Sequence, residues 1–247
     1  MHAVSRTAFV TGGTGFLGRH IVEQLTSMGW RVVAMHRPNS DVRHLVACNA
    51  ELCVGSVTDA KSVKRAMPPS CDAVFHVAGN LSLWSGGNAE QTRVNVTGTR
   101  IVAQVALEKE IKCFVHTSSV SAWGEQKKIP FDETATSTAR RSPVNYERSK
   151  YLGEIEVEKM IGKGLRAVFI NPGAVVGRYD KTGWARMLRL VQAEKLPAVH
   201  RGPRAGPTRT RSHGRTSPRS ITRGTASGTC SAASMRRSSR RWASWGS

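Results

Sequence analysis

Tyr146 and Lys150 are the residues whose types and spacing best suit acid–base chemistry. They stand four positions apart in a stretch with helical periodicity over 145–163, which places the phenol and the ammonium one turn apart on one helix face. A free tyrosine has a pKa of about 10, and a nearby cation favours its phenolate. On its own the pair has a simple alternative interpretation, a surface tyrosine beside a solvated lysine.

A hydroxyl-rich stretch, Thr117-Ser118-Ser119, strengthens the case for chemistry at this pair. It ends a predicted strand over 112–118. In a doubly wound parallel sheet, ligands bind beyond the carboxyl ends of the strands. A hydroxyl at that edge can hold a substrate carbonyl while Tyr146 gives or takes the proton.

Three glycines, Gly12, Gly15 and Gly18, form a second candidate site. They lie in TGGTGFLG at 11–18, between an apolar run at 7–11 and a helical pattern that begins at Leu17. Glycines at these positions let the turn close, let the backbone approach a pyrophosphate and let the helix pack on the strand. The strand–turn–helix context favours a dinucleotide site over an ordinary glycine-rich turn.

The stretch after the second predicted strand, Met35-His36-Arg37-Pro38, bears on the identity of the dinucleotide. NAD sites commonly carry an acid about twenty residues after the glycines to hold the ribose 2′-hydroxyl. Here the first acid is Asp41, and Arg37 offers a bidentate contact to a 2′-phosphate. The sequence therefore favours NADP(H) over NAD(H), with a solvated loop arginine as the alternative.

Alternating strands and helices must position these residues. Gly29 is expected to end the first helix. Nearly continuous apolar strands between helices are typical of a parallel sheet covered on both faces. We predict an α/β fold, a Rossmann-type doubly wound parallel sheet, over residues 1–199. Strands are predicted at 7–11, 31–35, 51–54, 73–78, 112–118 and 166–171, and long helices after residue 16, across 89–109 and over 145–163.

Charge divides the 247 residues into two regions. Eleven of the 37 Lys and Arg are arginines in 201–247, a stretch without lysine or acid, whereas the rest of the chain holds 26 basic and all 17 acidic residues. We expect an Arg/Ser/Gly-rich disordered tail at 200–247, because it has no Leu, Val, Phe or Tyr to bury. Such a tail can bind phosphate backbones, but only Trp242 and Trp245 could stack on bases, and no nucleic-acid partner is expected.

Composition also argues against membrane and disulfide-rich classes. No run approaches the roughly eighteen apolar residues of a membrane span, and no signal-peptide pattern precedes the first strand, so a cytoplasmic protein is expected. The five cysteines lack CxxC or zinc spacing, so neither a disulfide framework nor a metal site is expected. Buried reduced thiols are predicted for Cys48, Cys53, Cys71, Cys113 and Cys230.

Six motifs in order give the chain a family resemblance. They are TGGTGFLG at 11–18, HVAG at 76–79, NVTGT at 95–99, HTSSVSAWG at 116–124, YERSK at 146–150 and NPGAVVG at 171–177. Together they resemble the extended short-chain dehydrogenase/reductases, which include the NAD-dependent epimerase/dehydratases. Asn171-Pro172, where Arg-Pro is more usual, and Arg37 are similar to the dihydroflavonol reductase and cinnamoyl-CoA reductase branch.

The resemblance implies roles for individual residues. Ser119 matches the serine that polarises the carbonyl, Tyr146 the proton donor, and Lys150 the residue that binds the nicotinamide ribose and lowers the tyrosine pKa. Asn95 matches a structural asparagine, and Ser56 stands where relatives often have an aspartate near the adenine. The residues implied to bind the cofactor are Gly12, Thr14, Gly15, Phe16, Leu17, Gly18, Arg37, Ala78, Gly79, Tyr146, Lys150 and Pro172.

The activity implied by the resemblance is an NADP(H)-dependent reductase that acts on a small-molecule carbonyl or secondary alcohol by hydride transfer. A sugar-nucleotide epimerase/dehydratase or a hydroxysteroid dehydrogenase is the enzymatic alternative, since the shared machinery does not fix the substrate. An inactive dinucleotide-binding protein with a basic tail is the alternative from another class. Relatives often dimerise through the helices that match 89–109 and 145–163, so a homodimer is a further expectation.

The genetic code supplies a hypothesis for the tail. Relatives carry further strands and a substrate lid here, with stretches resembling DVA and GERYLLGG. When the third base of each codon is joined to the first two bases of the next, the codons for 215–218 permit DVA and those for 225–238 permit GERYLLGGVDASF. We therefore expect that a frameshift near residue 200 truncated or replaced the C-terminal substrate part.

Overall fold

The computed structural model describes residues 6–82, 84–126, 131–132, 134–181 and 184–195. Its sheet has six strands in the order β3-β2-β1-β4-β5-β6, and every neighbouring pair is parallel. The order reverses between β1 and β4, which confirms the predicted doubly wound Rossmann-type topology. The strands are β1 (Thr7–Thr11), β2 (Arg31–His36), β3 (Glu51–Val54), β4 (Ala73–His76), β5 (Phe114–Thr117) and β6 (Ala167–Ile170).

Helices connect the strands, and they include short ones that the sequence patterns did not predict. The helix expected across 89–109 is divided into an α-helix over Asn88–Thr92, a π-helical stretch over Arg93–Gly98 and an α-helix over Thr99–Glu108. Single 3₁₀ turns cover Ser85–Gly87, Val120–Trp123 and Ala139–Arg141. The α-helices are α1 (Phe16–Ser27), α2 (Arg43–Ala47), α3 (Ala60–Ala66), α4 (Asn88–Thr92), α5 (Thr99–Glu108), α6 (Asn145–Ile161) and α7 (Trp184–Gln192).

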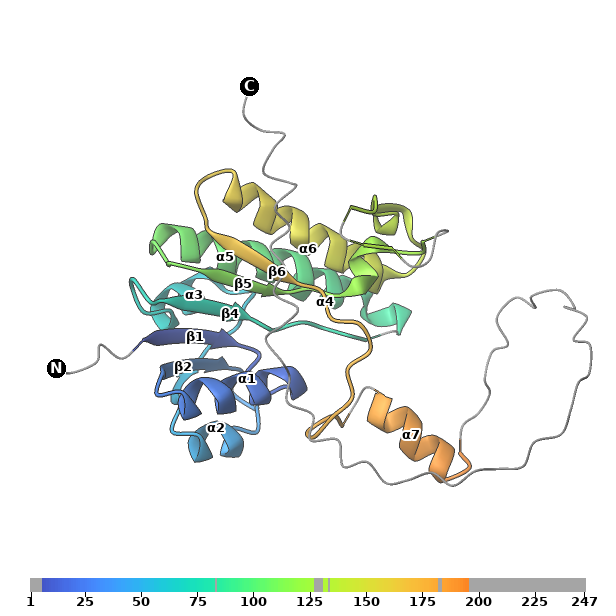
Figure 1. Cartoon of the computed structure of the whole chain (residues 1–247), viewed down its shortest axis with the longest axis horizontal. Coiled ribbons are helices and arrows are strands. Elements are labelled where there is room, and N and C mark those ends of the chain that lie inside the picture. Colours follow the sequence, from blue (N-terminus) through green and yellow to red (C-terminus); the bar gives the residue numbers. More distant parts are fainter. Residues whose placement is uncertain (1–5, 83, 127–130, 133, 182–183, 196–247) are drawn as a thin grey trace, which may run out of the picture.

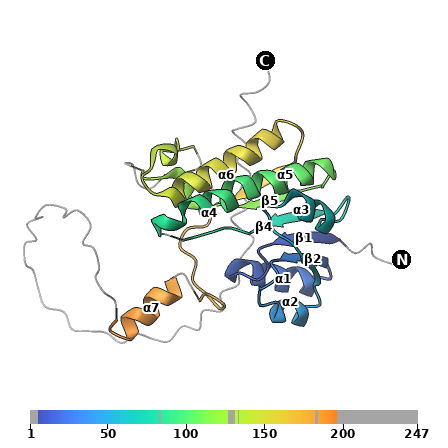
Figure 2. The same cartoon turned by 180° about the vertical axis from the view of Figure 1, so that it is seen from behind.

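Helices cover both faces of the sheet (Figures 1 and 2). Two hydrophobic clusters, one on each face, hold them there. On one face, Val10 of β1 packs in a cluster with Val22 of α1 and Leu45 of α2. On the other, Phe114 of β5 belongs to a cluster with Val157 of α6 and residues of α3 and α5. The first helix ends as predicted, because Gly29 follows it with φ of +78°.

Coverage of the sheet is incomplete at β6. Val168 of this strand is 37% exposed, and Val176 in the following loop is 59% exposed. Within the described residues the sheet is therefore covered on both faces at β1 and β2, as expected, whereas the edge strands β3 and β6 expose Leu52, Val54 and Val168. Helix α7 likewise exposes Met187, Leu188 and Val191.

The cysteines depart from the prediction. Among the four that fall in the described ranges, Cys71 is buried, whereas Cys48, Cys53 and Cys113 are half-buried, so the prediction of buried thiols was wrong for those three. Cys230 and the predicted tail at 200–247 lie outside the described residues. None of the helices that the structure describes is long and apolar enough to cross a membrane.

Candidate active site

The glycine-rich turn between β1 and α1 lies against the end of β4. Gly12 has φ of +75°, and a Cβ atom added to it would lie 2.5 Å from the Ala78 amide nitrogen. A Cβ atom on Gly18 would collide with the Gly12 carbonyl oxygen. Both positions therefore require glycine, because backbone approaches backbone there.

Helix α1 begins directly after this turn. Its N-cap is Gly15, without a side-chain capping bond, and its first turn contains no acid. The Thr14 carbonyl accepts a hydrogen bond from Arg19 Nε at 3.1 Å, while Phe16 and Leu17 are half-buried at the start of the helix. Unsatisfied N–H groups and the positive end of the helix dipole favour an anion. The turn therefore fits the pyrophosphate of a dinucleotide.

Arg37, the residue on which the NADP(H) prediction rests, lies just beyond the carboxyl end of β2. Its side chain is exposed, and its guanidinium forms no hydrogen bond or ion pair that is seen within the described ranges. Asp41 is engaged elsewhere, since its hydrogen bonds with Arg43 hold the pKa of its carboxyl well below the usual range. The pKa of Glu90 is lowered first by its hydrogen bond with Arg93 and in smaller part by the charge of Arg37.

Ser119 and Tyr146 meet at the carboxyl edge of the sheet. Ser119 follows β5 and is 9% exposed, Tyr146 lies in the first turn of α6, and their side chains are hydrogen-bonded. Ser119 Oγ also accepts the Ser121 N–H at 3.1 Å. The structure thus brings together two residues that stand 27 positions apart in the sequence.

Lys150 lies one turn further along α6 and is 8% exposed. Its Nζ donates to the Thr117 carbonyl at 3.1 Å and would lie 3.5 Å from a Cβ atom on Gly79. Burial lowers the pKa of Lys150 to about 8, although Glu154 opposes this. Burial also raises the pKa of Tyr146, against the opposing hydrogen bond with Ser119, so the expected lowering of the tyrosine pKa is not found in this structure.

Asn95 joins the loop after β4 to helix α6. Its Oδ1 accepts the Asn80 N–H at 2.8 Å, and its Nδ2 donates to the Asn80 carbonyl at 3.0 Å and to Ser149 Oγ at 2.9 Å. Ser149 Oγ in turn donates to the Tyr146 carbonyl at 2.8 Å. Sequence patterns identified neither Asn80 nor Ser149, because single polar residues carry no periodic signal.

The loop after β6 completes the site from the other side. The Pro172 carbonyl accepts the Val120 N–H at 3.1 Å. Asn171 Nδ2 donates to the Ser119 carbonyl at 3.1 Å and to Glu154 Oε1 at 2.6 Å. Asn171 thereby ties the serine loop to α6, a role that its place in the sequence did not reveal.

The model of the NAD dependent epimerase/dehydratase family matches residues 8–203, which is most of the chain and includes every residue of the candidate site described above. The chain belongs to this family. The match includes the glycine-rich turn, the Ser119 loop and the Tyr146–Lys150 pair. Arg37 also falls within it.

Two curated proteins are similar to this chain over 174 and 183 residues. "Sterol demethylase protein B" of Methylococcus capsulatus is 34% identical over 174 residues, 70% of this chain and 53% of that protein. A Synechocystis protein described as a candidate dihydroflavonol 4-reductase is 33% identical over 183 residues, 72% of this chain and 52% of that protein. The chain thus spans about half the length of these curated relatives.

A solved structure supports the fold. The Bordetella bronchiseptica enzyme WbmH, in complex with NAD+, is 24% identical and superposes with a TM-score of 0.68, covering 77% of this chain and 64% of that enzyme. At this identity the likeness concerns the fold alone.

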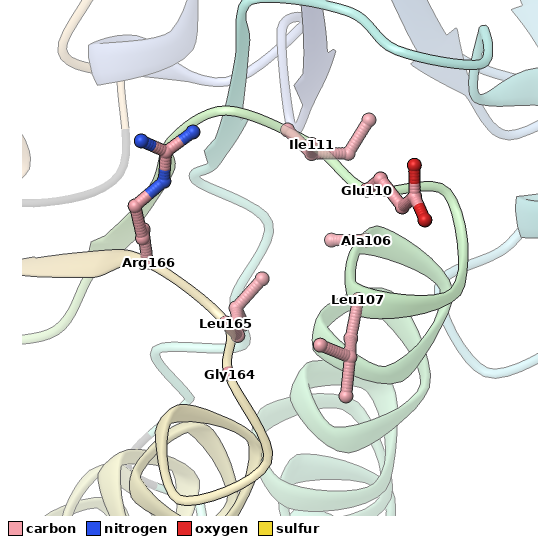
Figure 3. Close-up of a pocket in the computed structure, with 7 residues that line it drawn as sticks. All are labelled: Ala106, Leu107, Glu110, Ile111, Gly164, Leu165 and Arg166. Carbon is pink, nitrogen blue, oxygen red and sulfur yellow. The ribbon is translucent and has the colours of Figure 1, made fainter.

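A hollow of about 220 Å³ lies at the opposite edge of the sheet, where β5 and β6 begin (Figure 3). Ligands of doubly wound sheets bind at the carboxyl ends of the strands, so this hollow is not part of the candidate site. It is lined by Ala106, Leu107, Glu110, Ile111, Gly164, Leu165 and Arg166.

Proposed function

We propose that the chain forms the cofactor-binding and catalytic part of an NADP(H)-dependent reductase that interconverts a carbonyl and a secondary alcohol. The observation that carries the proposal is the hydrogen-bonded Ser119–Tyr146 pair with Lys150 buried beside Gly79. These groups lie at the same sheet edge as the glycine-rich turn. The dihydroflavonol 4-reductase-like relative supports this substrate chemistry over others of the family.

The chain's own residues would manage the proton and the substrate oxygen. A bound nicotinamide supplies or takes up the hydride. Tyr146 Oη gives its proton to the oxygen that develops negative charge, and Ser119 Oγ donates a hydrogen bond to the same oxygen. The Lys150 ammonium favours the resulting phenolate until solvent returns the proton.

Matched tyrosine variants test this proposal. Tyr146→Phe is compared with Tyr151→Phe, which removes a hydroxyl from the same helix outside the site. Because acid–base catalysis contributes about 10²–10⁴-fold, Tyr146→Phe should lower kcat by at least about 100-fold on a panel of ketones with NADPH. Equal turnover by the two variants would refute the proposed role of Tyr146.

Cofactor preference rests on Arg37. Loss of a charge-assisted hydrogen bond costs about 1.5–3 kcal/mol, so Arg37→Gln should weaken NADPH binding by roughly 10- to 150-fold and leave NADH binding nearly unchanged. Arg43→Gln is the matched control, because its guanidinium is held by Asp41. Equal losses for NADPH and NADH, measured by fluorescence titration, would remove the support for NADP(H).

Two alternatives have specific support. A sterol substrate is favoured by the name of the Methylococcus relative, and an epimerase or dehydratase reaction by the family description. The other alternative is a chain that binds a dinucleotide without turnover, for which the glycine-rich turn alone would suffice. NADPH binding without Tyr146-dependent turnover of any ketone, sterol or nucleotide sugar would establish the last alternative.

A further inference from the structure

A chain of hydrogen bonds runs through the interior of the sheet, and His76 lies at its centre. The Ala78 N–H donates to Thr11 Oγ1 at 3.4 Å, and Thr11 Oγ1 lies 2.8 Å from His76 Nδ1. On the other side of the ring, Nε2 lies 3.0 Å from Thr99 Oγ1. His76 is 0% exposed, so solvent cannot replace any of these partners.

The direction of each bond follows from the last acceptor. Thr99 Oγ1 lies 2.8 Å from the Asn95 carbonyl, which can only accept, so the Thr99 hydroxyl proton is used there. His76 Nε2 must therefore carry a proton and donate to Thr99 Oγ1. Its Nδ1 is then bare and accepts the Thr11 hydroxyl proton, which leaves Thr11 Oγ1 free to accept the Ala78 N–H.

Charges around the ring favour the same neutral form. Burial lowers the pKa of His76 to about 3, and the charge of Lys150 on α6 acts in the same direction. On β5 the facing group is His116, whose ring stacks on His76 with centroids 5.5 Å apart. Burial also lowers the pKa of His116 and so disfavours a positive charge on either ring.

The two ends of this chain are functional parts of the candidate site. Thr11 and Ala78 flank the contact between Gly12 and the end of β4 that shapes the cofactor turn. At the other end, the Asn95 side chain donates to Ser149 Oγ, which donates to the Tyr146 carbonyl. Each hydroxyl on the path has one proton and one direction in which to donate it.

We propose that His76, neutral and protonated on Nε2, is a positioning residue that ties the cofactor turn to the start of α6 and so fixes Tyr146 relative to the nicotinamide. The inference rests on the proposed function for its kinetic consequence, but its hydrogen-bond arrangement is testable alone. Strands β1 and β4, which carry Thr11 and His76, lie side by side beneath α5 and α6 (Figure 2).

Nitrogen-15 NMR of the histidine-labelled chain tests the tautomer, with the His76 signals assigned by their loss in His76→Phe. We expect a protonated Nε2 and a bare Nδ1, unchanged between about pH 5 and pH 8. A protonated Nδ1, or a titration midpoint within that range, would overturn the proposal. This measurement needs no turnover, so it remains decisive even if the proposed function fails.

Threonine variants test the positioning role. Thr99→Val removes the acceptor for Nε2–H, and Thr26→Val is matched, because Thr26 Oγ1 also donates to a carbonyl four residues earlier but contacts no histidine. Measured on folded protein below the melting temperature, Thr99→Val should lower kcat about tenfold with little change in KM for cofactor, and Thr99→Ser should restore it. Wild-type kcat in Thr99→Val, or no rescue by serine, would contradict the positioning role, whereas absence of turnover in the wild-type chain would contradict only the proposed function.

Discussion

Replacement of Gly12 by alanine tests whether the close backbone approach at the cofactor turn is as tight as the structure shows. Two costs add at this position. The φ of +75° costs an L residue about 1–2 kcal/mol, and insertion of a methyl group into packed surroundings costs about 1–3 kcal/mol more. Because the neighbour 2.5 Å away is the Ala78 backbone, it cannot rotate aside as a side chain could.

Gly29 supplies a control for the first of these costs. Its φ is +78°, and a Cβ atom added to it would meet nothing within 4 Å. Gly29→Ala should therefore lower the free energy of unfolding by about 1–2 kcal/mol, and Gly12→Ala by about 2–5 kcal/mol. The difference between the two variants isolates the collision with Ala78.

Urea unfolding at equilibrium measures both values, and titration with NADPH shows the effect on the cofactor turn. We expect Gly29→Ala to bind NADPH as the wild type does. Gly12→Ala should show no measurable NADPH binding at urea concentrations at which it is still folded. Equal destabilisation by the two variants would refute the claim that the Ala78 backbone, just after β4, packs tightly against Gly12. Retained NADPH affinity in Gly12→Ala would refute the assignment of the turn as the cofactor site.

Three further predictions concern other parts of the chain. Below about pH 8 Lys150 is protonated in both the folded and the unfolded state, whereas above pH 8 the folded state loses the proton first. The free energy of unfolding of the wild type relative to Lys150→Met should therefore rise between pH 8 and pH 10. A difference in urea midpoint that does not change with pH would contradict this. Burial raises the pKa of Cys71 to about 11, so iodoacetamide at neutral pH should modify Cys48, Cys53 and Cys113 before Cys71, as peptide mapping can show. Sequencing of the gene should find DVA and GERYLLGG one base out of phase in the codons for 215–218 and 225–238, and a stop codon in that phase would exclude the frameshift.

The sequence predicted the strands of the sheet well because each one combines an apolar run with a glycine or polar boundary. Helices α2 and α3 were missed, since Arg43–Ala47 buries only Leu45 and Ala60–Ala66 is too short to show helical periodicity. The sequence pattern also did not predict that the helix expected across 89–109 is interrupted by a π-helical stretch. Its π-helical stretch contains Asn95, whose side chain and carbonyl both bond to distant residues.

The candidate site was predictable as far as topology governs it. Ser119 and Tyr146 meet because β5 ends and α6 begins at the same sheet edge. The contacts that hold them, through Asn80, Ser149 and Asn171, depend on distances between elements that no spacing in the sequence encodes. The direction of the Tyr146 pKa shift was missed for the same reason, since burial decides it.

The contact between Gly12 and Ala78 also governs when a cofactor can act on the folding chain. The first strand–helix–strand unit, over 7–36, is local in sequence and can form early. The backbone that packs against its glycine-rich turn, however, comes from Ala78, just after β4. Lys150, which lies beside Gly79 in the folded chain, is synthesised after all of β4. A ligand stabilises only the states that bind it. A dinucleotide should therefore stabilise only states in which β4 and α6 are packed on the sheet, and it should not stabilise earlier folding intermediates. The unfolding rate of the native chain should therefore decrease as the dinucleotide concentration rises, whereas the rates of its earliest folding steps should not change.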